Sequence, residues 1–292
     1  MSCLPKAGKA NRWVAEMDVP YKLYKGDCLE IMPTLEAGSV DAILADLPYG
    51  TTACSWDSII PLDELWREYK RLIKPNGIIL LFGVMPFTSV LWQSNSKDWR
   101  YEFVWRKNGA TRFLDANERP LLDYENIEVF YSRQPTYNPQ KFKGEKAHGR
   151  GRSVGNKSNI EIYRNVFTTK ADQSGDKFPR LVLDFDKVAP SEILHPTQKP
   201  VDLCEYLIRT YTNPDDIVLD NTMGSGTTIV SAIQTGRKSI GIEKEKKYFD
   251  VAVKRASQAH PPLFVESPRN PTQRAVDVWD SAALPGFSTP EG

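Results

Sequence analysis

A carboxylate, a proline and an aromatic ring stand side by side in the tetrapeptide DLPY, residues 46–49. The tetrapeptide follows VDAILA, an apolar run typical of a buried strand, so Asp46 and Tyr49 should lie at the carboxyl end of that strand. A carboxylate can accept hydrogen bonds from an amine, Pro48 stiffens the backbone beside it, and a ring face can stack on a planar ligand. Taken alone, the same residues could equally form a turn packed against the core.

A second stretch whose residues could bind a ligand reads VLDNTMGSGTT, residues 218–228. Asp220 ends a predicted strand, and two glycines, Gly224 and Gly226, precede a helix expected to begin near Thr227. Glycines let the backbone turn sharply and approach a ligand, and a helix amino end offers unpaired N–H groups to an anion. The loop matches neither GxxxxGK[ST] nor GxGxxG, which disfavours a nucleoside triphosphatase and a nicotinamide dehydrogenase.

An acid follows this loop at an informative distance. The next predicted strand, SIGIE, ends in Glu243, about 20 residues beyond the glycines, where Rossmann-type sites place an acid that binds the hydroxyls of an adenosine ribose. The loop and Glu243 together favour a nucleoside cofactor.

The elements that must position these residues alternate between strand and helix along the chain, which predicts an α/β sheet with helices on both faces. A Pro/Gly turn, KPNG at 74–77, should separate the first long helix from the strand after it. The predicted strands are 40–45, 78–83, 101–106, 126–131, 216–220 and 238–243, and the predicted helices are 62–73, 86–94, 201–211, 227–236 and 245–259.

One segment is markedly basic. Residues 132–180 hold eleven Lys and Arg against four Asp and Glu, although the net charge of the chain is only +1. The segment is also rich in Gly, Ser and Asn, and it shows no sustained helical or strand period. By itself this composition would fit a solvated loop as well as a surface that binds phosphates.

Four motifs in one order carry a family resemblance: YKGDCLEIMPTL at 24–35, DLPY at 46–49, HPTQKP at 195–200 and DNTMGSGTT at 220–228. The chain resembles the beta-class amino-group DNA methyltransferases over roughly residues 21–257. In that class the catalytic tetrapeptide precedes the cofactor loop, and a basic variable region lies between them. The resemblance implies a doubly wound, Rossmann-like methyltransferase sheet with an inserted basic target-recognition region.

The resemblance also implies roles for individual residues. The carboxylate of Asp46 and the carbonyl of Leu47 would hold the exocyclic amine of a base flipped out of double-stranded DNA, Pro48 would stiffen this segment, and Tyr49 would stack on the base. The cofactor would be S-adenosyl-L-methionine, and no metal would be needed. Residues implied in cofactor binding are Asp27, Lys199, Pro200, Asp220, Gly224, Ser225, Gly226, Thr227 and Glu243. Residues that would contact DNA are Arg150, Arg152, Asn156 and Lys157.

Two motifs depart from the family pattern. Leu47 stands where the first proline of the tetrapeptide is usual, and Asn221-Thr222-Met223 stands where Pro-Phe-Ala or a similar triplet is common. Neither change removes a reacting group, because Leu47 still has a carbonyl. An Asp at the first tetrapeptide position is commoner in adenine-N6 enzymes, which favours that reaction. Cytosine-N4 methylation and a catalytically idle DNA-binding module stay open as alternatives.

Four parts of the chain are expected. These are a catalytic half at 21–106, a target-recognition insertion at 107–190, a cofactor-binding half at 191–259, and an extended or disordered tail at 260–292. The four cysteines lack metal-site spacing and are interpreted as reduced and structural, and His195 is assigned a structural or substrate-loop role. No signal peptide or long apolar run is seen, so a cytoplasmic protein is expected. A homodimer and a cognate restriction nuclease are both compatible with the resemblance.

Overall fold

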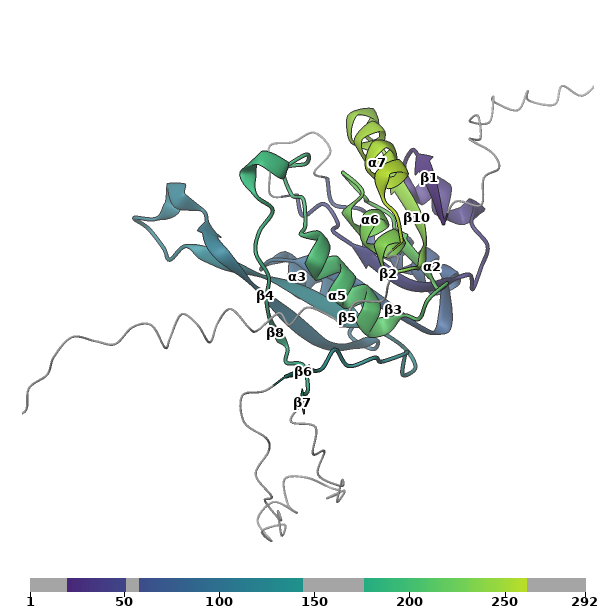
Figure 1. Ribbon diagram of the computed structural model, residues 1–292, viewed down its shortest axis with the longest axis horizontal. Helices are drawn as coiled ribbons and strands as arrows, with labels where there is room; N and C mark the ends of the chain where they lie inside the picture. The colour runs from purple at the N-terminus through teal and green to yellow at the C-terminus, as the bar shows by residue number, and fades with distance from the viewer. Residues whose placement is uncertain (1–19, 51–57, 144–175, 262–292) are drawn as a thin grey trace, which may run out of the picture.

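The computed structural model of the chain describes residues 20–50, 58–143 and 176–261 (Figure 1). Within these residues, eight strands form one twisted sheet in the order β1-β10-β9-β2-β3-β5-β4-β8. The strands are β1 (Tyr21–Lys25), β2 (Val40–Ala45), β3 (Ile73–Gly83), β4 (Trp99–Thr111), β5 (Leu122–Phe130), β8 (Val182–Asp184), β9 (Ile217–Asp220) and β10 (Lys238–Glu243). A separate short pair joins β6 (Phe142–Lys143) to β7 (Asp176–Lys177).

The half of the sheet from β1 to β3 is parallel. Ile43 of β2 pairs with Leu219 of β9 on one side and with Ile79 of β3 on the other. Beyond β3, β5 and β4 form an antiparallel pair, and β8 adds to β4 in parallel. Because all strands of the parallel half point the same way, their carboxyl ends meet at one edge of the sheet.

Helices cover both faces of the sheet, so the predicted doubly wound fold is confirmed (Figure 1). On one face lie α1 (Cys28–Ile31), α2 (Leu62–Leu72) and α3 (Phe87–Ser94), and on the other lie α5 (Val201–Tyr211), α6 (Thr227–Gln234) and α7 (Lys246–Gln258). Three short 3-10 turns complete the described elements: η1 (Met32–Thr34), η2 (Phe113–Asp115) and η3 (Pro190–Glu192).

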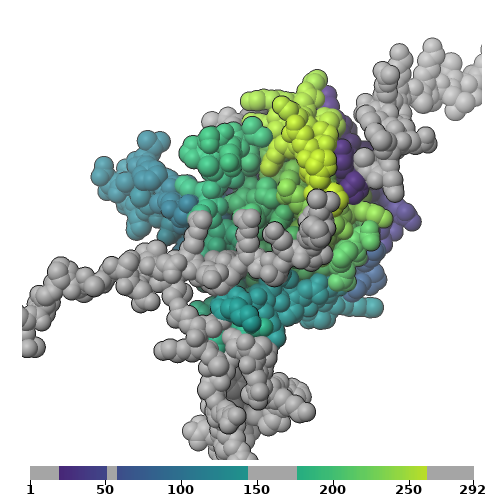
Figure 2. Space-filling model, in the orientation of Figure 1, coloured from purple at the N-terminus to yellow at the C-terminus, as the bar shows by residue number. Residues whose placement is uncertain are grey.

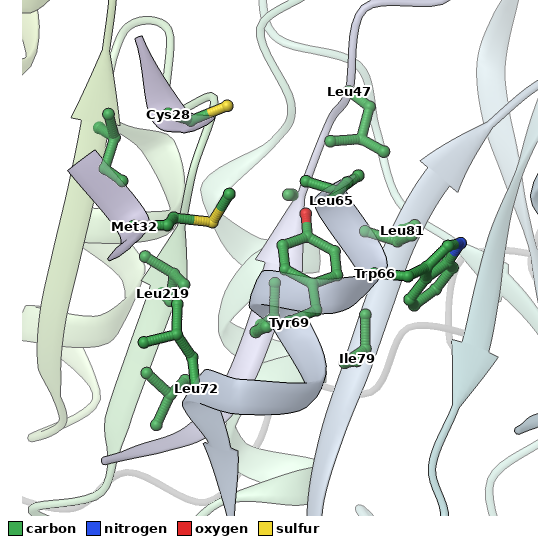
Figure 3. Packing of buried hydrophobic residues seen from close by; sticks show 14 of the residues in the cluster. Cys28, Met32, Leu47, Leu65, Trp66, Tyr69, Leu72, Ile79, Leu81 and Leu219 are labelled. Carbon is green, nitrogen blue, oxygen red and sulfur yellow. The ribbon is translucent and has the colours of Figure 1, made fainter. Parts of the chain in front are cut away.

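Alternation along the buried strands explains this layering. In β2, Ile43 and Ala45 belong to the same buried cluster as Tyr69 and Leu72 of α2. Figure 3 shows these two helix residues within the cluster. Ala42 and Leu44 face the opposite side, which α5 covers. Successive side chains of a strand point to opposite faces, so a run that is apolar at every position is buried on both.

The junction between α2 and β3 differs from the prediction. A Pro/Gly turn was expected at 74–77, but β3 begins at Ile73, directly after α2. The KPNG residues form an irregularity inside the strand, since Val40 is opposite Ile73 whereas Ala42 is opposite Ile78. The extra residues are accommodated as a bulge, where a proline and a glycine are tolerated.

Strands β4 and β5 continue past the sheet as a hairpin arm, which stands away from the body in Figures 1 and 2. Phe113 and Leu114 near its tip are exposed. The boundary expected at residue 107 falls inside β4, and β5 and β8 also belong to the main sheet. Within 107–190, the end of β4 and strands β5 and β8 are therefore part of the main sheet, whereas β6 and β7 pair separately. In the described residues no helix is long and apolar enough to cross a membrane.

Candidate functional site

The chemically active side chains gather at the carboxyl edge of the parallel half-sheet. Asp46 follows β2, Asp220 ends β9, Glu243 ends β10, and Asp27 follows β1. These four acids line one cavity of about 560 Å³. A volume in this range is typical of small-molecule and cofactor sites.

The tetrapeptide presents an oriented carboxylate to this cavity. The Tyr49 hydroxyl donates to Oδ1 of Asp46 at 2.5 Å, and Nζ of Lys199 donates to Oδ2 at 2.6 Å. The ring of Tyr49 lies against Phe87, with the ring centroids 4.9 Å apart. Both carboxylate oxygens thus have one donor each, and each keeps lone-pair capacity for a ligand.

Lys199 belongs to a buried chain of alternating charges. Its Nζ lies 3.2 Å from Oε2 of Glu125, and Nζ of Lys107 lies 2.5 Å from Oε1 of the same glutamate. The chain runs Lys107, Glu125, Lys199, Asp46, so two cations balance two anions where isolated charges would be costly.

This chain sets the protonation of its members. Burial raises the pKa of Asp46, while the Lys199 ammonium opposes the rise. Burial also acts against the charge on Lys199, but the Asp46 and Glu125 carboxylates outweigh it and raise the pKa of Lys199. Burial also disfavours the charged form of Glu125, yet Lys199 and Lys107 hold the pKa of Glu125 below its ordinary value. Lys199, together with the Tyr49 hydroxyl, thus favours an ionised Asp46.

The glycine loop forms another part of the cavity wall. Gly224 and Gly226 have φ angles of +50° and +78°, a region that favours glycine, and Gly226 is the N-cap of α6. Glu243 shapes the loop, because its carboxylate accepts the backbone N–H of Gly224 at 2.9 Å and that of Glu245 at 2.7 Å. Burial raises the pKa of Glu243, and it raises the pKa of Asp220 to about 7.

A family model described as DNA methylase matches residues 40–254. The match covers most of the chain, including the tetrapeptide, the basic region and the cofactor loop. The chain belongs to this family of amino-group DNA methyltransferases. The family uses S-adenosylmethionine as its cofactor.

The sequences of two relatives align with most of this methyltransferase. The Type II methyltransferase M.HinfI of Haemophilus influenzae is 29% identical over 296 residues, covering 88% of this chain and 76% of that protein. M2.MboI of Moraxella bovis is 25% identical, covering 84% of this chain and 91% of that protein.

Solved structures share its fold. The M1.HpyAVI–SAM complex aligns with a TM-score of 0.56 and 26% identity, over 80% of this chain and 98% of that one. PvuII DNA methyltransferase, described as cytosine-N4-specific, aligns with a TM-score of 0.59 over 89% of this chain and 91% of that one. At 15% identity, that second likeness shows the fold alone.

Within the methyltransferase, all but two of the predicted site residues that fall in the described segments line the cavity. The two exceptions have other positions. Pro200 precedes α5 and lines a neighbouring cavity of about 680 Å³. Gly226 makes close packing possible, since a Cβ there would lie 2.9 Å from Cβ of Ala252 on α7. Asp27 lines the cavity while capping α1, and its other oxygen binds Lys244.

Four predicted residues were assigned to DNA contacts. Arg150, Arg152, Asn156 and Lys157 lie outside the described residues, so these four assignments stay predictions. His195 lines the cavity, with its ring 4.1 Å from that of Tyr248. Burial, together with the charges of Lys199 and Lys247, lowers the pKa of His195 to about 4, so its ring is neutral at pH 7.

Several residues of the site were missed by sequence reasoning. Lys107 and Glu125 fell within the expected insertion 107–190, just outside the predicted strands 101–106 and 126–131, and neither was singled out. Lys199 was assigned to the cofactor, not to the Asp46 carboxylate. Tyr49 was given a stacking face, whereas its hydroxyl also binds Asp46. Arg255 of α7 was not singled out, although it donates to the carbonyl and hydroxyl oxygens of Ser225 in the glycine loop.

Proposed function

We propose that this methyltransferase transfers a methyl group from S-adenosylmethionine to the N6 amine of an adenine flipped out of double-stranded DNA. One observation carries the proposal. The Asp46 carboxylate and the Glu243 glycine loop line the same continuous cavity, so a cofactor held by the loop and an amine held by the tetrapeptide would meet within it.

The cavity suits S-adenosylmethionine in shape and in chemistry. Its loop wall has glycine at Gly224, where the backbone has a left-handed φ that favours glycine and a Cβ would lie 3.4 Å from the His195 ring. Glu243 keeps lone pairs for the ribose hydroxyls after accepting its two backbone N–H groups. Asp220 and Ser225 would lie along the methionine part, and Asp27 near the adenine amine.

Asp46 and Leu47 would act on the target. The lone pair of an aromatic amine is delocalised into the ring, so the amine becomes a nucleophile only when its N–H groups are held out of the ring plane. The Asp46 carboxylate and the Leu47 carbonyl would accept these N–H groups and leave the lone pair facing the cofactor. The bound cofactor would supply an electrophilic methyl on its sulfonium. The nitrogen–methyl bond would form as the sulfur–methyl bond breaks, the sulfur would leave as a neutral thioether, and the methylated nitrogen would then lose one proton to solvent.

Lys199 and Tyr49 would keep Asp46 competent. Only an ionised carboxylate can accept hydrogen bonds through both oxygens, and the Lys199 ammonium favours that state. The Tyr49 hydroxyl would fix the rotation of the carboxylate, and its ring would stack on the base.

The hairpin arm borders the same cavity. Thr111 and Arg112 near the end of β4, and Leu122 at the start of β5, contribute to the cavity wall. DNA that delivers a base to Asp46 would therefore pass close to this arm. We assign the arm, with the basic segment 132–180, to target binding and recognition.

The experiment is transfer of radiolabelled methyl from S-adenosylmethionine to duplex DNA, followed by digestion to nucleosides and mass spectrometry. N6-methyladenine is expected, because an Asp begins the tetrapeptide. N4-methylcytosine would show the alternative target. No label above that of Asp46→Ala would indicate a catalytically idle DNA-binding module.

A further inference from the structure

The side chain of Thr222 connects the cofactor loop directly to the catalytic tetrapeptide. Its hydroxyl donates to the backbone carbonyl of Asp46 at 3.0 Å, across a sequence separation of 176 residues. Its own backbone N–H is held by Oδ1 of Asp220 at 3.1 Å. Thr222 therefore lies between the acid that ends β9 and the carboxyl end of β2.

The loop is anchored on its other side as well. Oδ1 of Asn221 accepts the hydroxyl of Tyr69 at 2.6 Å, and both residues are buried. Figure 3 shows this hydroxyl at the end of the ring that faces Cys28 and Leu47, away from the body of α2. With Asn221 fixed to α2, the neighbouring Thr222 is a rigid support, so its hydroxyl can restrain the tetrapeptide.

The Thr222 hydroxyl restrains the Asp46–Leu47 peptide group, which precedes the Leu47 carbonyl, the expected acceptor for the amine. The carbonyl of Asp46 and the N–H of Leu47 belong to one planar unit, so a hydrogen bond to that carbonyl fixes the plane from which Leu47 departs. Pro48 already limits the ψ angle of Leu47 to extended values. The φ angle of Leu47 is the remaining freedom, and a proline at position 47 would have fixed it near −65°.

We infer that Thr222 is a positioning residue: its hydroxyl aligns the Asp46–Leu47 peptide so that the carboxylate of Asp46 and the carbonyl of Leu47 face one amine. The hydroxyl thereby restrains a segment that Leu47, unlike a proline at the same position, leaves free to rotate about φ. The inference rests on the proposed methyl transfer, whichever base is the target.

The test compares Thr222→Val, which removes the hydroxyl at nearly constant volume, with Thr222→Ser, which keeps it. At saturating DNA and cofactor, Thr222→Val should lower kcat about five- to tenfold, the effect of one neutral hydrogen bond. Thr222→Ser should recover most of this loss. The dissociation constant of S-adenosylmethionine, measured by calorimetry, should stay within about twofold, because the bond acts on the tetrapeptide.

Leu47→Pro provides a second, independent arm. In the part of the chain that the structure describes, the Leu47 N–H donates to no backbone carbonyl outside the helices and strands, so a proline at 47 breaks no such bond. In the Thr222→Val background, Leu47→Pro should restore most of kcat, since the ring replaces the lost restraint. Thr210→Val is the matched control, because the Thr210 hydroxyl also donates to a backbone carbonyl, that of Tyr206, but within α5 and away from the cavity.

Hydrogen exchange tests the contact without any reference to activity. Deuterium uptake at Tyr49 and Gly50 should be faster in Thr222→Val than in wild type and slow again in the double variant. Unchanged uptake, an unchanged kcat, or a loss confined to cofactor affinity would overturn the inference. Wild-type protein that transfers no label to DNA would instead overturn the proposed function, while the exchange measurement would still decide the role of Thr222.

Discussion

The Tyr49 hydroxyl and the Asp46 carboxylate, three residues apart, form a hydrogen bond of 2.5 Å inside the cavity. The other oxygen of the carboxylate receives the Lys199 ammonium at 2.6 Å. Asp46 is consequently held from two sides before any ligand arrives. An acceptor that is already oriented needs little reorganisation when it takes an amine, which is how fixed polar groups stabilise a transition state.

Tyr49→Phe should therefore lower kcat, even though the ring face for stacking is kept. A hydrogen bond to a charged group contributes about 1.5 kcal/mol or more, so a loss of roughly tenfold is expected. Steady-state methyl transfer at saturating DNA measures it. Tyr101→Phe is a matched control, since the Tyr101 hydroxyl pairs with that of Tyr211 away from the cavity. A Tyr49→Phe enzyme as fast as wild type would assign Tyr49 to stacking alone.

Lys199→Met should shift the acid limb of the pH–rate profile to higher pH. Burial raises the pKa of Asp46, and Lys199 is the cation that counters this rise. Without it, the pKa of Asp46 rises further. Because activity needs the ionised carboxylate, activity is lost at a higher pH as the solution is acidified.

Lys107→Met separates this direct effect from a general loss of charge. Lys107 contacts Glu125 and not Asp46, so its removal should move the acid limb less than Lys199→Met. Equal shifts in the two variants would mean that the charge chain acts as one unit. If Lys199→Met did not shift the acid limb, the ionisation of Asp46 would not be what limits the rate at low pH.

Glu243→Ala should weaken S-adenosylmethionine binding by roughly 1–3 kcal/mol, measured by calorimetry. The variant loses the acceptor for the ribose hydroxyls and leaves the N–H groups of Gly224 and Glu245 without their partner. Asp250→Ala, on the exposed side of α7, is the control for removal of one acid. Unchanged affinity in Glu243→Ala would exclude this carboxylate from the cofactor site.

The strand ends were predictable from sequence because their signals are local. The runs AILA (42–45) and IVL (217–219) are apolar at every position, and an acid follows each directly, so Asp46 and Asp220 could be placed at the same sheet edge. The glycine loop and Glu243 follow the same logic. Each of these features is defined by residues within about 25 positions of one another, so the sequence alone indicates both the residue types and their relative placement.

Glu125 and Lys107 could not be predicted in this way. They reach the site from β5 and β4, and only the antiparallel pairing of those strands beside β3 brings them to Lys199. Nothing in YEFVWRK or DYENIE marks one charged residue as buried. The expected boundary at 107 falls inside β4, whose polar second half looks like a loop until β5 pairs with it.

Arg150→Ala combined with Arg152→Ala should weaken DNA binding and flatten its salt dependence. Each phosphate contact that is lost removes roughly 0.9 from the log–log slope for duplex DNA. If either arginine reads a base edge, discrimination against altered sites should also fall by about 1–3 kcal/mol. Titrations of cognate and scrambled duplexes at several salt concentrations distinguish these cases.

The matched control for this pair is Arg67→Ala with Lys70→Ala, which changes the net charge equally on the exposed side of α2. That variant should keep the slope and the affinity of wild type. If the Arg150 and Arg152 variant did so as well, the basic segment would be a solvated loop.

Glu128→Gln should remove a pH dependence of stability. Burial, with the nearby Glu102, raises the pKa of Glu128 from 4.5 to about 7 in the folded protein. Between these values the folded chain keeps a proton that the unfolded chain releases, so wild-type stability should fall as the pH rises from about 4.5 to about 7. The glutamine has no proton to lose and can still accept from Nε1 of Trp99, which lies 2.6 Å from Oε2 of Glu128. In urea unfolding, the variant should therefore gain on wild type between pH 5 and pH 8, whereas Glu36→Gln, at an exposed position, should not. Parallel curves for Glu128→Gln and wild type would show that this carboxyl group titrates alike in the folded and unfolded chains.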